Sequence, residues 1–415
     1  MFRIVLVKPR NIKAMFRYRW MANYLAVPMM VDRHTQGLRG EHLRICHAEQ
    51  DVIIEDVAKL LDKLFRGDRR IGNDEEFSKK VVLVDENEMQ SVMMGFPTVV
   101  PLSREIASTY IPVLLNQRAA IHYIDVAQEY GLAGDVCPMP EAEAGVSIDD
   151  DAPILGCCAV QCNTTCDGSL LSNGVISKRM EFEDGIPVFQ LASPLRHMNE
   201  DVQEYAAQEI RNAIAFIEEH TGEKWDWDYY FECAKRVNYA TKCRLEWLEM
   251  SKSPYPQVFG SNLALYTETN YMAISGRLPI FEKTDRKIMR LAEKAYKKKK
   301  MAANEYRHRA IVWGVQSHYY MDLLVWMLNC WGIVPLTDML SMDNTTMIAE
   351  EDTPENREQA MYDIAMLTEK MIMRNRTHGG YKVLLDDLWE IVTEFNADMV
   401  ILWEHMSCKA LDGMH

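Results

Sequence analysis

The chain has 415 residues, of which 48% are hydrophobic and 26% are charged, and its formal net charge is −15. This composition is typical of a globular protein of two or three domains, and the negative charge argues against a nucleic-acid surface. No apolar run is long enough to cross a bilayer, and the apolar run at the N-terminus is too short for a secretory signal. We therefore expect a cytoplasmic protein whose ten cysteines stay reduced and include metal ligands rather than disulfides.

Residues 1–78 are expected to form a helical N-terminal extension. Apolar residues recur at helical spacing from Val52 to Phe65, which predicts a helix there. The turn-forming stretches Arg66-Gly67-Asp68 and Ile71-Gly72-Asn73-Asp74 then mark a boundary. No residue of this extension has a chemical role that its type or spacing reveals.

Two segments, 79–200 and 306–415, show short apolar strand patterns that alternate with helix patterns, and residues 201–305 between them are overwhelmingly helical. Such alternation favours parallel, doubly wound sheets, so we predict an α/β protein with two such domains and a helical insertion. Strands are predicted at 80–85, 98–102, 153–160, 186–191, 310–315, 332–336 and 398–403. Helices are predicted at 86–94, 119–130, 202–220, 227–251, 319–330, 357–374 and 381–395.

Four cysteines lie close together where the predicted strand 153–160 gives way to a polar turn; they are Cys157, Cys158, Cys162 and Cys166. Asp167-Gly168 is expected to be the break after this strand. Cys137, Cys166 and Cys408 each end or follow a strand-like run, which would place their thiols at the edge where open α/β sheets bind ligands. Three thiolates from separate loops suit an iron–sulfur cluster with one iron left open as a Lewis acid.

Other interpretations of these residues remain. Cys162-x-x-x-Cys166 also fits half of a zinc site, and cysteines that only fill the core are a further alternative. His405 lies near Cys408 and is a candidate proton donor or hydrogen-bond partner of a sulfide. The sequence has no phosphate-binding Walker loop, no dinucleotide fingerprint and no G-x-S-x-G nucleophile motif.

Several of these stretches resemble the iron–sulfur subunits of the 2-hydroxyacyl-CoA dehydratase and benzoyl-CoA reductase superfamily. The most specific are three cysteine segments in order: Asp135-Val136-Cys137, Cys162-Asn163-Thr164-Thr165-Cys166-Asp167-Gly168 and Met406-Ser407-Cys408-Lys409. Two helical-segment stretches, 221–226 and 253–256, are also similar to the family. The resemblance covers roughly residues 80–415.

The resemblance implies two flavodoxin-like domains that hold a [4Fe-4S] cluster through Cys137, Cys166 and Cys408, with Cys162 as a further candidate ligand and His405 as a candidate catalytic residue. It implies a related second subunit, a separate ATP-hydrolysing iron–sulfur activator and an acyl-CoA substrate. It further implies an oxygen-sensitive enzyme in which the thioester carbonyl meets the open iron. Dehydratases of the family form a ketyl radical that expels a hydroxyl group, whereas its reductases reduce a conjugated ring.

The chain departs from the family pattern in three places. Asp85-Glu86-Asn87-Glu88-Met89 replaces a serine-rich turn, and Leu102-Ser103 follows Pro101 where an acidic residue is expected, with Glu105 further on. The chain also ends at His415, soon after the third cysteine segment, which predicts a shortened or divergent member. Two alternatives stay open: a double-cubane reductase or electron carrier that uses Cys157, Cys158 and Cys162, and a non-catalytic scaffold subunit.

Overall fold

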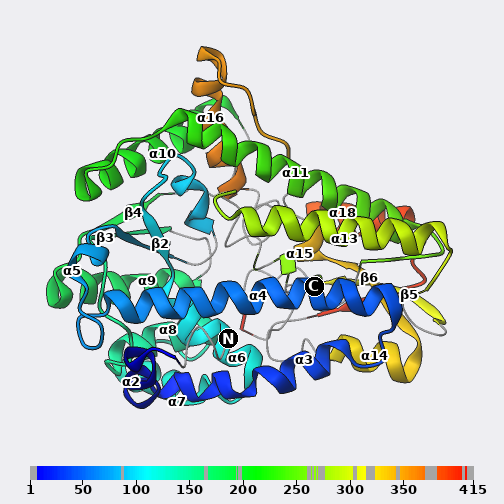
Figure 1. The fold of residues 1–415 in the computed structure, drawn as a ribbon, viewed down its shortest axis with the longest axis horizontal. Helices are drawn as coiled ribbons and strands as arrows, with labels where there is room; N and C mark the ends of the chain where they lie inside the picture. Colours follow the sequence, from blue (N-terminus) through cyan, green and yellow to red (C-terminus); the bar gives the residue numbers. More distant parts are fainter. Residues whose placement is uncertain are drawn as a thin grey trace.

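The computed structural model shows two parallel sheets, which stand side by side and are joined by long helices (Figure 1). It describes residues 7–85, 88–162, 167–192, 194, 199–258, 263, 266–267, 269, 276–301, 306–314, 323–342, 346–369, 381–403 and 407–408. No helix among them is long and apolar enough to cross a bilayer.

The first sheet has four parallel strands in the order β2-β1-β3-β4, which are Val100–Leu102, Val81–Val84, Cys158–Cys162 and Val188–Leu191. This is the strand order with which a flavodoxin-like sheet begins. Every residue of β1 and β3 is buried because helices cover both faces of the sheet, as the all-apolar run of β1 predicts. Val81 and Leu83 pack in one core, and Val82 and Val84 pack in the other.

The second sheet has three parallel strands in the order β6-β5-β7, which are Ile333–Asp338, His308–Trp313 and Met399–Leu402. The same two-one-three order recurs here, so the predicted α/β class with two doubly wound, flavodoxin-like sheets is confirmed. Arg309 fixes the start of β5: its guanidinium donates to five carbonyl oxygens, those of Ser251, Lys252, Ser253, Phe395 and Asn396.

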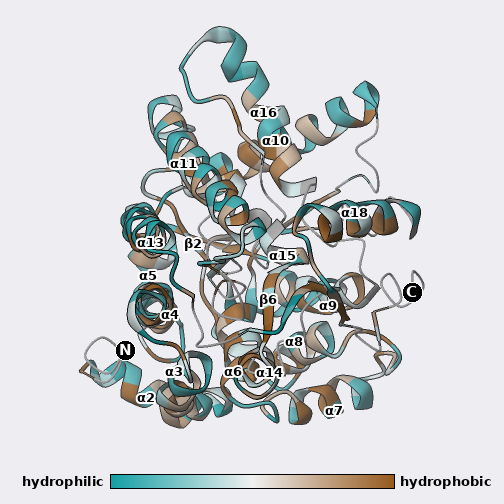
Figure 2. Cartoon of the chain, turned by 90° about the vertical axis from the view of Figure 1, so that its right-hand side faces the viewer, coloured by the Kyte–Doolittle hydropathy of each residue, from teal (hydrophilic) through white to brown (hydrophobic). Residues whose placement is uncertain are grey.

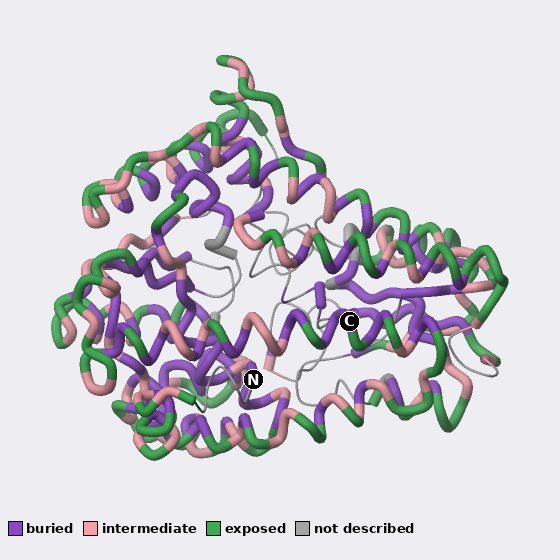
Figure 3. Tube along the Cα trace, viewed as in Figure 1, coloured by how far each residue is buried: buried purple, intermediate pink, exposed green. Residues whose placement is uncertain are grey.

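The helices surround these sheets, and their apolar sides face inward (Figure 2). Those around the first sheet are α5 (Glu75–Ser78), η2 (Glu88–Met93), η3 (Ile106–Tyr110), α6 (Ile111–Leu115), α7 (Ile121–Tyr130), α8 (Pro138–Ile148), α9 (Asp167–Arg179) and η4 (Met180–Asp184). The connecting layer is α10 (Glu200–Thr221), α11 (Trp227–Lys252) and α13 (Pro279–Lys297). Later helices are α14 (Leu323–Trp331), α15 (Met339–Met342), α16 (Pro354–Glu369) and α18 (Tyr381–Glu394). The buried trace concentrates in the strands and the inner helix faces (Figure 3).

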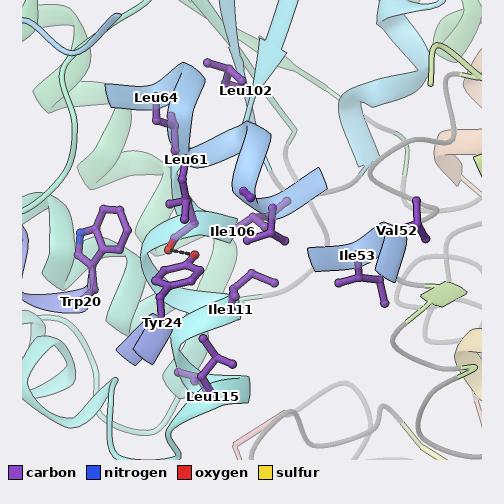
Figure 4. Packing of buried hydrophobic residues seen from close by; sticks show 14 of the residues in the cluster. Trp20, Tyr24, Val52, Ile53, Leu61, Leu64, Leu102, Ile106, Ile111 and Leu115 are labelled. Atoms are coloured by element: carbon purple, nitrogen blue, oxygen red, sulfur yellow. Dashed lines mark hydrogen bonds between the residues drawn. The ribbon is translucent and has the colours of Figure 1, made fainter. Parts of the chain in front are cut away.

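The N-terminal segment consists of α2 (Pro9–Arg17), η1 (Arg19–Ala26), α3 (Val27–Thr35) and α4 (Gly40–Gly67), and it connects the two sheets. The 28 residues of α4 span about 42 Å at 1.5 Å per residue, and the helix runs from one sheet toward the other beside α13 (Figure 1). At the first sheet, Tyr24 donates to the carbonyl of Ala107 at 2.7 Å within the packed core of Figure 4. Near the second, Asn329 of α14 donates to the carbonyl of Gln36 at 3.0 Å.

Two local expectations were wrong. The predicted strand 153–160 begins at Cys158, because Asp68 and Arg69 of the N-terminal segment bond the backbone of Ile154, which keeps that residue out of the sheet. Asp167-Gly168, the expected break after this strand, forms the first two residues of α9. The other predicted strands and helices are present with shifted ends, although 86–87, 315, 319–322, 370–374 and the predicted turn 378–380 lie outside the described residues.

Candidate functional site

The carboxyl ends of the parallel strands form the edge at which doubly wound sheets bind ligands, above all beside the first strand where the strand order reverses. In the first sheet this point lies between β1 and β3, and Asp85 directly follows β1 there. In the second sheet it lies between β5 and β7, and Cys408 follows β7.

Cys137 is the N-cap residue of α8, and its side chain is partly exposed at the margin of the first core. The expectation that it follows a strand was wrong: residues 131–136 form turns, and Pro138 starts the helix at its first position, where proline's missing N–H costs nothing. The positive end of the helix dipole and its unpaired N–H groups favour an anionic sulfur at this position. A helix start, rather than a strand end, therefore positions this thiol.

Helices α8 and α9 run parallel and side by side. At their beginnings, a Cβ placed on Gly168 would lie 3.2 Å from Cγ of Pro140 and 3.4 Å from Cβ of Cys137. At their ends, Arg179 donates to the carbonyl of Ile148 at 3.1 Å. The N-termini of two helices therefore meet beside Cys137, and the absence of a side chain at Gly168 lets them approach closely.

Cys166 and His405 lie outside the described residues, which resume with Asp167 and with Ser407. Cys166 immediately precedes α9 in the sequence, two residues before Gly168. The proposed role of Cys166 as a cluster ligand therefore stays a prediction.

Cys408 is 7% exposed and packs in the core of the second sheet with Ile311, Trp313 and Met339. Its predicted place at the carboxyl edge of the second sheet stays a prediction, because residues 404–406, which join it to β7, lie outside the described residues. Among the residues that the structure describes, no three His, Cys, Asp or Glu side chains gather closely enough to hold a metal ion. Since Cys166 is not among them, this observation leaves the three-cysteine set untested.

Cys162 is the last residue of β3, and its side chain packs with Val82, Val84 and Val160. Cys137, α8 and α9 belong to the core on the opposite face of the sheet. The side chain of Cys162 therefore points away from the face that carries the paired helix starts.

Cys157 and Cys158 lie at the other end of β3, with their sulfurs 3.9 Å apart. Four residue steps at about 3.3 Å place Cys158 about 13 Å along the strand from Cys162. These two thiols are therefore at the opposite edge of the sheet from the predicted site, and the grouping of Cys157, Cys158 and Cys162 seen in the sequence is not a grouping in space.

A buried hydrogen-bond network, which our sequence reasoning missed, closes the β1–β3 switch point. The Asn173 side chain of α9 donates at 2.8 Å to Asp85 and at 2.9 Å to the carbonyl oxygen of Cys162. Asp85 is 6% exposed and Asn173 is 3% exposed. The network ties α9 to the ends of both strands, and the signal that could have revealed it is a carboxylate directly after the all-apolar run 81–84.

An acidic side chain also lies at the edge next to β2. Glu105 is 8% exposed at the start of η3, and its carboxylate is 3.7 Å from Nε of Arg104. The η3 segment is a π-helical turn, a feature that is frequent at functional sites. The chain thus carries a buried carboxylate near this edge, three residues later than the family pattern suggested.

Taken together, the fold defines a class: an α/β protein with two doubly wound sheets, in which Cys162 ends β3 of the first and Cys408 follows β7 of the second in the sequence. Comparison with known families gives the particular assignment. Residues 98–415, about three quarters of the chain, match the family described as 2-hydroxyglutaryl-CoA dehydratase, D-component. The chain therefore belongs to this family, within the 2-hydroxyacyl-CoA dehydratase superfamily that the cysteine segments indicated. No curated protein matches it significantly.

Proposed function

We propose that this chain is the [4Fe-4S]-binding subunit of an oxygen-sensitive enzyme of the 2-hydroxyacyl-CoA dehydratase type, with Cys137, Cys166 and Cys408 as the cluster ligands. The observation that carries the proposal is the pair of parallel helices α8 and α9, whose beginnings meet beside Cys137, directly after the position of Cys166. Family membership supports the dehydratase component, and the cluster and its ligands are our inference.

The residues present fit such a group chemically. A cluster held by cysteines carries net negative charge, and two helix N-termini supply the N–H donors and dipole field that stabilise it. The bound cluster would supply one-electron chemistry and a Lewis-acidic iron for the thioester carbonyl. The chain's own contribution is to hold Cys137 at a helix start, anchor α9 through Asp85 and Asn173, and bury Cys408 against the second sheet.

We propose that the substrate is an acyl-CoA that loses a hydroxyl group, with reduction of a conjugated acyl group as the remaining alternative. A related second subunit and an ATP-hydrolysing iron–sulfur activator would complete the enzyme, in the cytoplasm. The proposed organisation is a helical extension (1–78), two α/β domains (79–200 and 306–415) and a helical segment between them (201–305). His405 remains a proposed proton donor, since it lies outside the described residues.

Anaerobic iron and sulfide analysis of single-cysteine variants tests the ligand assignment. We expect about four irons per chain in the natural protein, and loss of most of this iron in Cys137→Ala, Cys166→Ala and Cys408→Ala. Cys243→Ala is the control, because Cys243 is buried in α11 and burial raises the pKa of its thiol to about 12, which keeps it protonated.

Equal iron content in Cys408→Ala and Cys243→Ala would contradict the assignment. About eight irons per chain would favour the double-cubane alternative, and an iron-free protein would favour a scaffold subunit. Electron paramagnetic resonance of the reduced protein, before and after addition of candidate acyl-CoA thioesters, then tests the substrate class: a changed signal is expected only if the thioester reaches the cluster.

A further inference from the structure

A recess of about 290 Å³ lies between helix α4 and the free edge of β2. Its wall from α4 is formed by Asp56, Leu60 and Lys63, and its opposite wall by residues 97–103 together with Tyr229 and Arg277. Pro97 and Thr98 are exposed at its rim, so water reaches it from outside. Its volume is at the lower end of the range for small-molecule sites.

The recess exists because β2 is an edge strand. The backbone N–H of Val100 donates to the carbonyl oxygen of Lys80, so the backbone groups of Val100 face β1. Those of the next residue, Pro101, therefore face the recess. Proline has no N–H, and the strand therefore offers the recess an acceptor carbonyl and no donor at this residue. Another strand cannot extend the sheet here, which leaves the space to a small ligand.

Two opposite charges line the recess without a direct contact between them. Asp56 and Lys63 are seven residues apart on one face of α4, and neither makes a hydrogen bond or ion pair with any residue that the structure describes. Both side chains are half-buried; burial lowers the pKa of Lys63 and raises that of Asp56, and their mutual attraction only partly opposes these shifts. Charges held in this way are costly unless something pairs with them.

Arg277 adds a second, fixed cation opposite α4. Its Nη2 donates to the carbonyl oxygens of Phe96 at 2.6 Å and Val99 at 2.5 Å, which fixes the plane of the guanidinium. These two carbonyls use two of the five N–H donors of an arginine. With Lys63 and Asp56 ionised, the recess carries a net charge of +1, so an anion with a single negative charge would balance it.

We propose that this recess binds a small organic acid, whose carboxylate or phosphate pairs with Lys63 and Arg277 and whose hydroxyl group donates to Asp56. The acid and donor groups of such a ligand match the two unpaired charges of α4, and its size matches the volume. Asp56 and Lys63 lie outside residues 98–415, so the site joins the N-terminal segment to the family-matched region.

Isothermal titration of the full-length, anaerobically purified chain with acetate, glycolate and inorganic phosphate tests the proposal. Glycolate adds one hydroxyl donor to acetate, and a hydrogen bond to the Asp56 carboxylate should strengthen its binding about tenfold. Phosphate that binds more tightly than either carboxylate would identify a phosphate ligand. Affinity should fall as the pH rises through the lowered pKa of Lys63, because the ammonium loses its charge.

Three variants separate the contributions. Lys63→Met should weaken all three probes at least about tenfold, Lys63→Arg should retain binding, and Asp56→Asn should weaken glycolate relative to acetate. The matched control is Lys59→Met, one turn away on α4, where the lysine pairs with Glu55 outside the recess. The proposal is overturned if no probe binds the natural chain, or if Lys63→Met and Lys59→Met bind every probe equally well.

Discussion

Glu49 offers a sharp test of how α4 is built into the protein interior. It lies on the inner face of α4, is 1% exposed, and neither of its carboxylate oxygens has a hydrogen-bond partner among the described residues. Asp285 of α13 lies nearby and accepts a hydrogen bond from Tyr266 at 2.5 Å. Burial, with a smaller contribution from the charge of Asp285, raises the pKa of Glu49 from 4.5 to about 8.

The sign and size of the effect follow from proton linkage. Between these two pKa values the folded chain keeps a proton that the unfolded chain releases, so the free energy of unfolding falls as the pH rises. From about pH 5.5 to about pH 7.5 this single group should reduce it by about 2.5 kcal/mol. Glu49→Gln keeps the shape but cannot ionise, and should remove this part of the pH dependence.

The measurement is urea unfolding, followed by circular dichroism, at the two pH values. Glu55→Gln is the matched control, because Glu55 lies on the exposed side of the same helix and pairs with Lys59. It should change the pH dependence by less than about 0.5 kcal/mol. If Glu49→Gln shows the same pH dependence as the natural chain, Glu49 is not the buried, proton-holding group described above.

Three further substitutions test packing and hydrogen bonding. A Cβ at Gly145 of α8 would overlap the carbonyl oxygen of Tyr123 in α7, so Gly145→Ala should cost more than about 3 kcal/mol. A Cβ at Gly174 of α9 would have no heavy atom within 4 Å, so Gly174→Ala should stabilise the folded chain by about 0.5–1 kcal/mol. Equal midpoints of thermal unfolding for the two variants would contradict this ranking. Arg309→Met should cost about 3 kcal/mol or more in chemical denaturation, since it leaves five carbonyls without their donor, and a loss under about 1 kcal/mol would refute that role.

Much of the fold could be predicted from the sequence because its signals are local. The apolar runs at 81–84 and 310–313 are buried strands as predicted. Gly131 and Gly222 end their helices in the left-handed conformation that glycine adopts most easily. Where a remote segment competes for the backbone, prediction failed: Asp68 and Arg69 hold Ile154 outside β3.

For the candidate site, too, local sequence signals were informative, whereas contacts between remote segments could not be predicted. The order and spacing of its cysteine segments led to the family, which the comparison confirms for residues 98–415. The sequence could not show that Cys157 and Cys158 lie at the wrong edge of the sheet, because adjacency along a strand says nothing about which edge a residue occupies. It also could not show that Asn173 anchors α9 to Asp85, since 88 residues separate the two.

By itself, the sequence determined the α/β class, the helical N-terminal segment and the family, because hydrophobic periodicity and short motifs are properties of neighbouring residues. Only the tertiary structure decided that α8 and α9 begin side by side at Cys137, that α4 connects the two sheets, and that Asp56 and Lys63 face Arg277 across a recess. The physical reason is that these arrangements depend on contacts between segments far apart in the chain, which are set by packing and burial of the whole molecule.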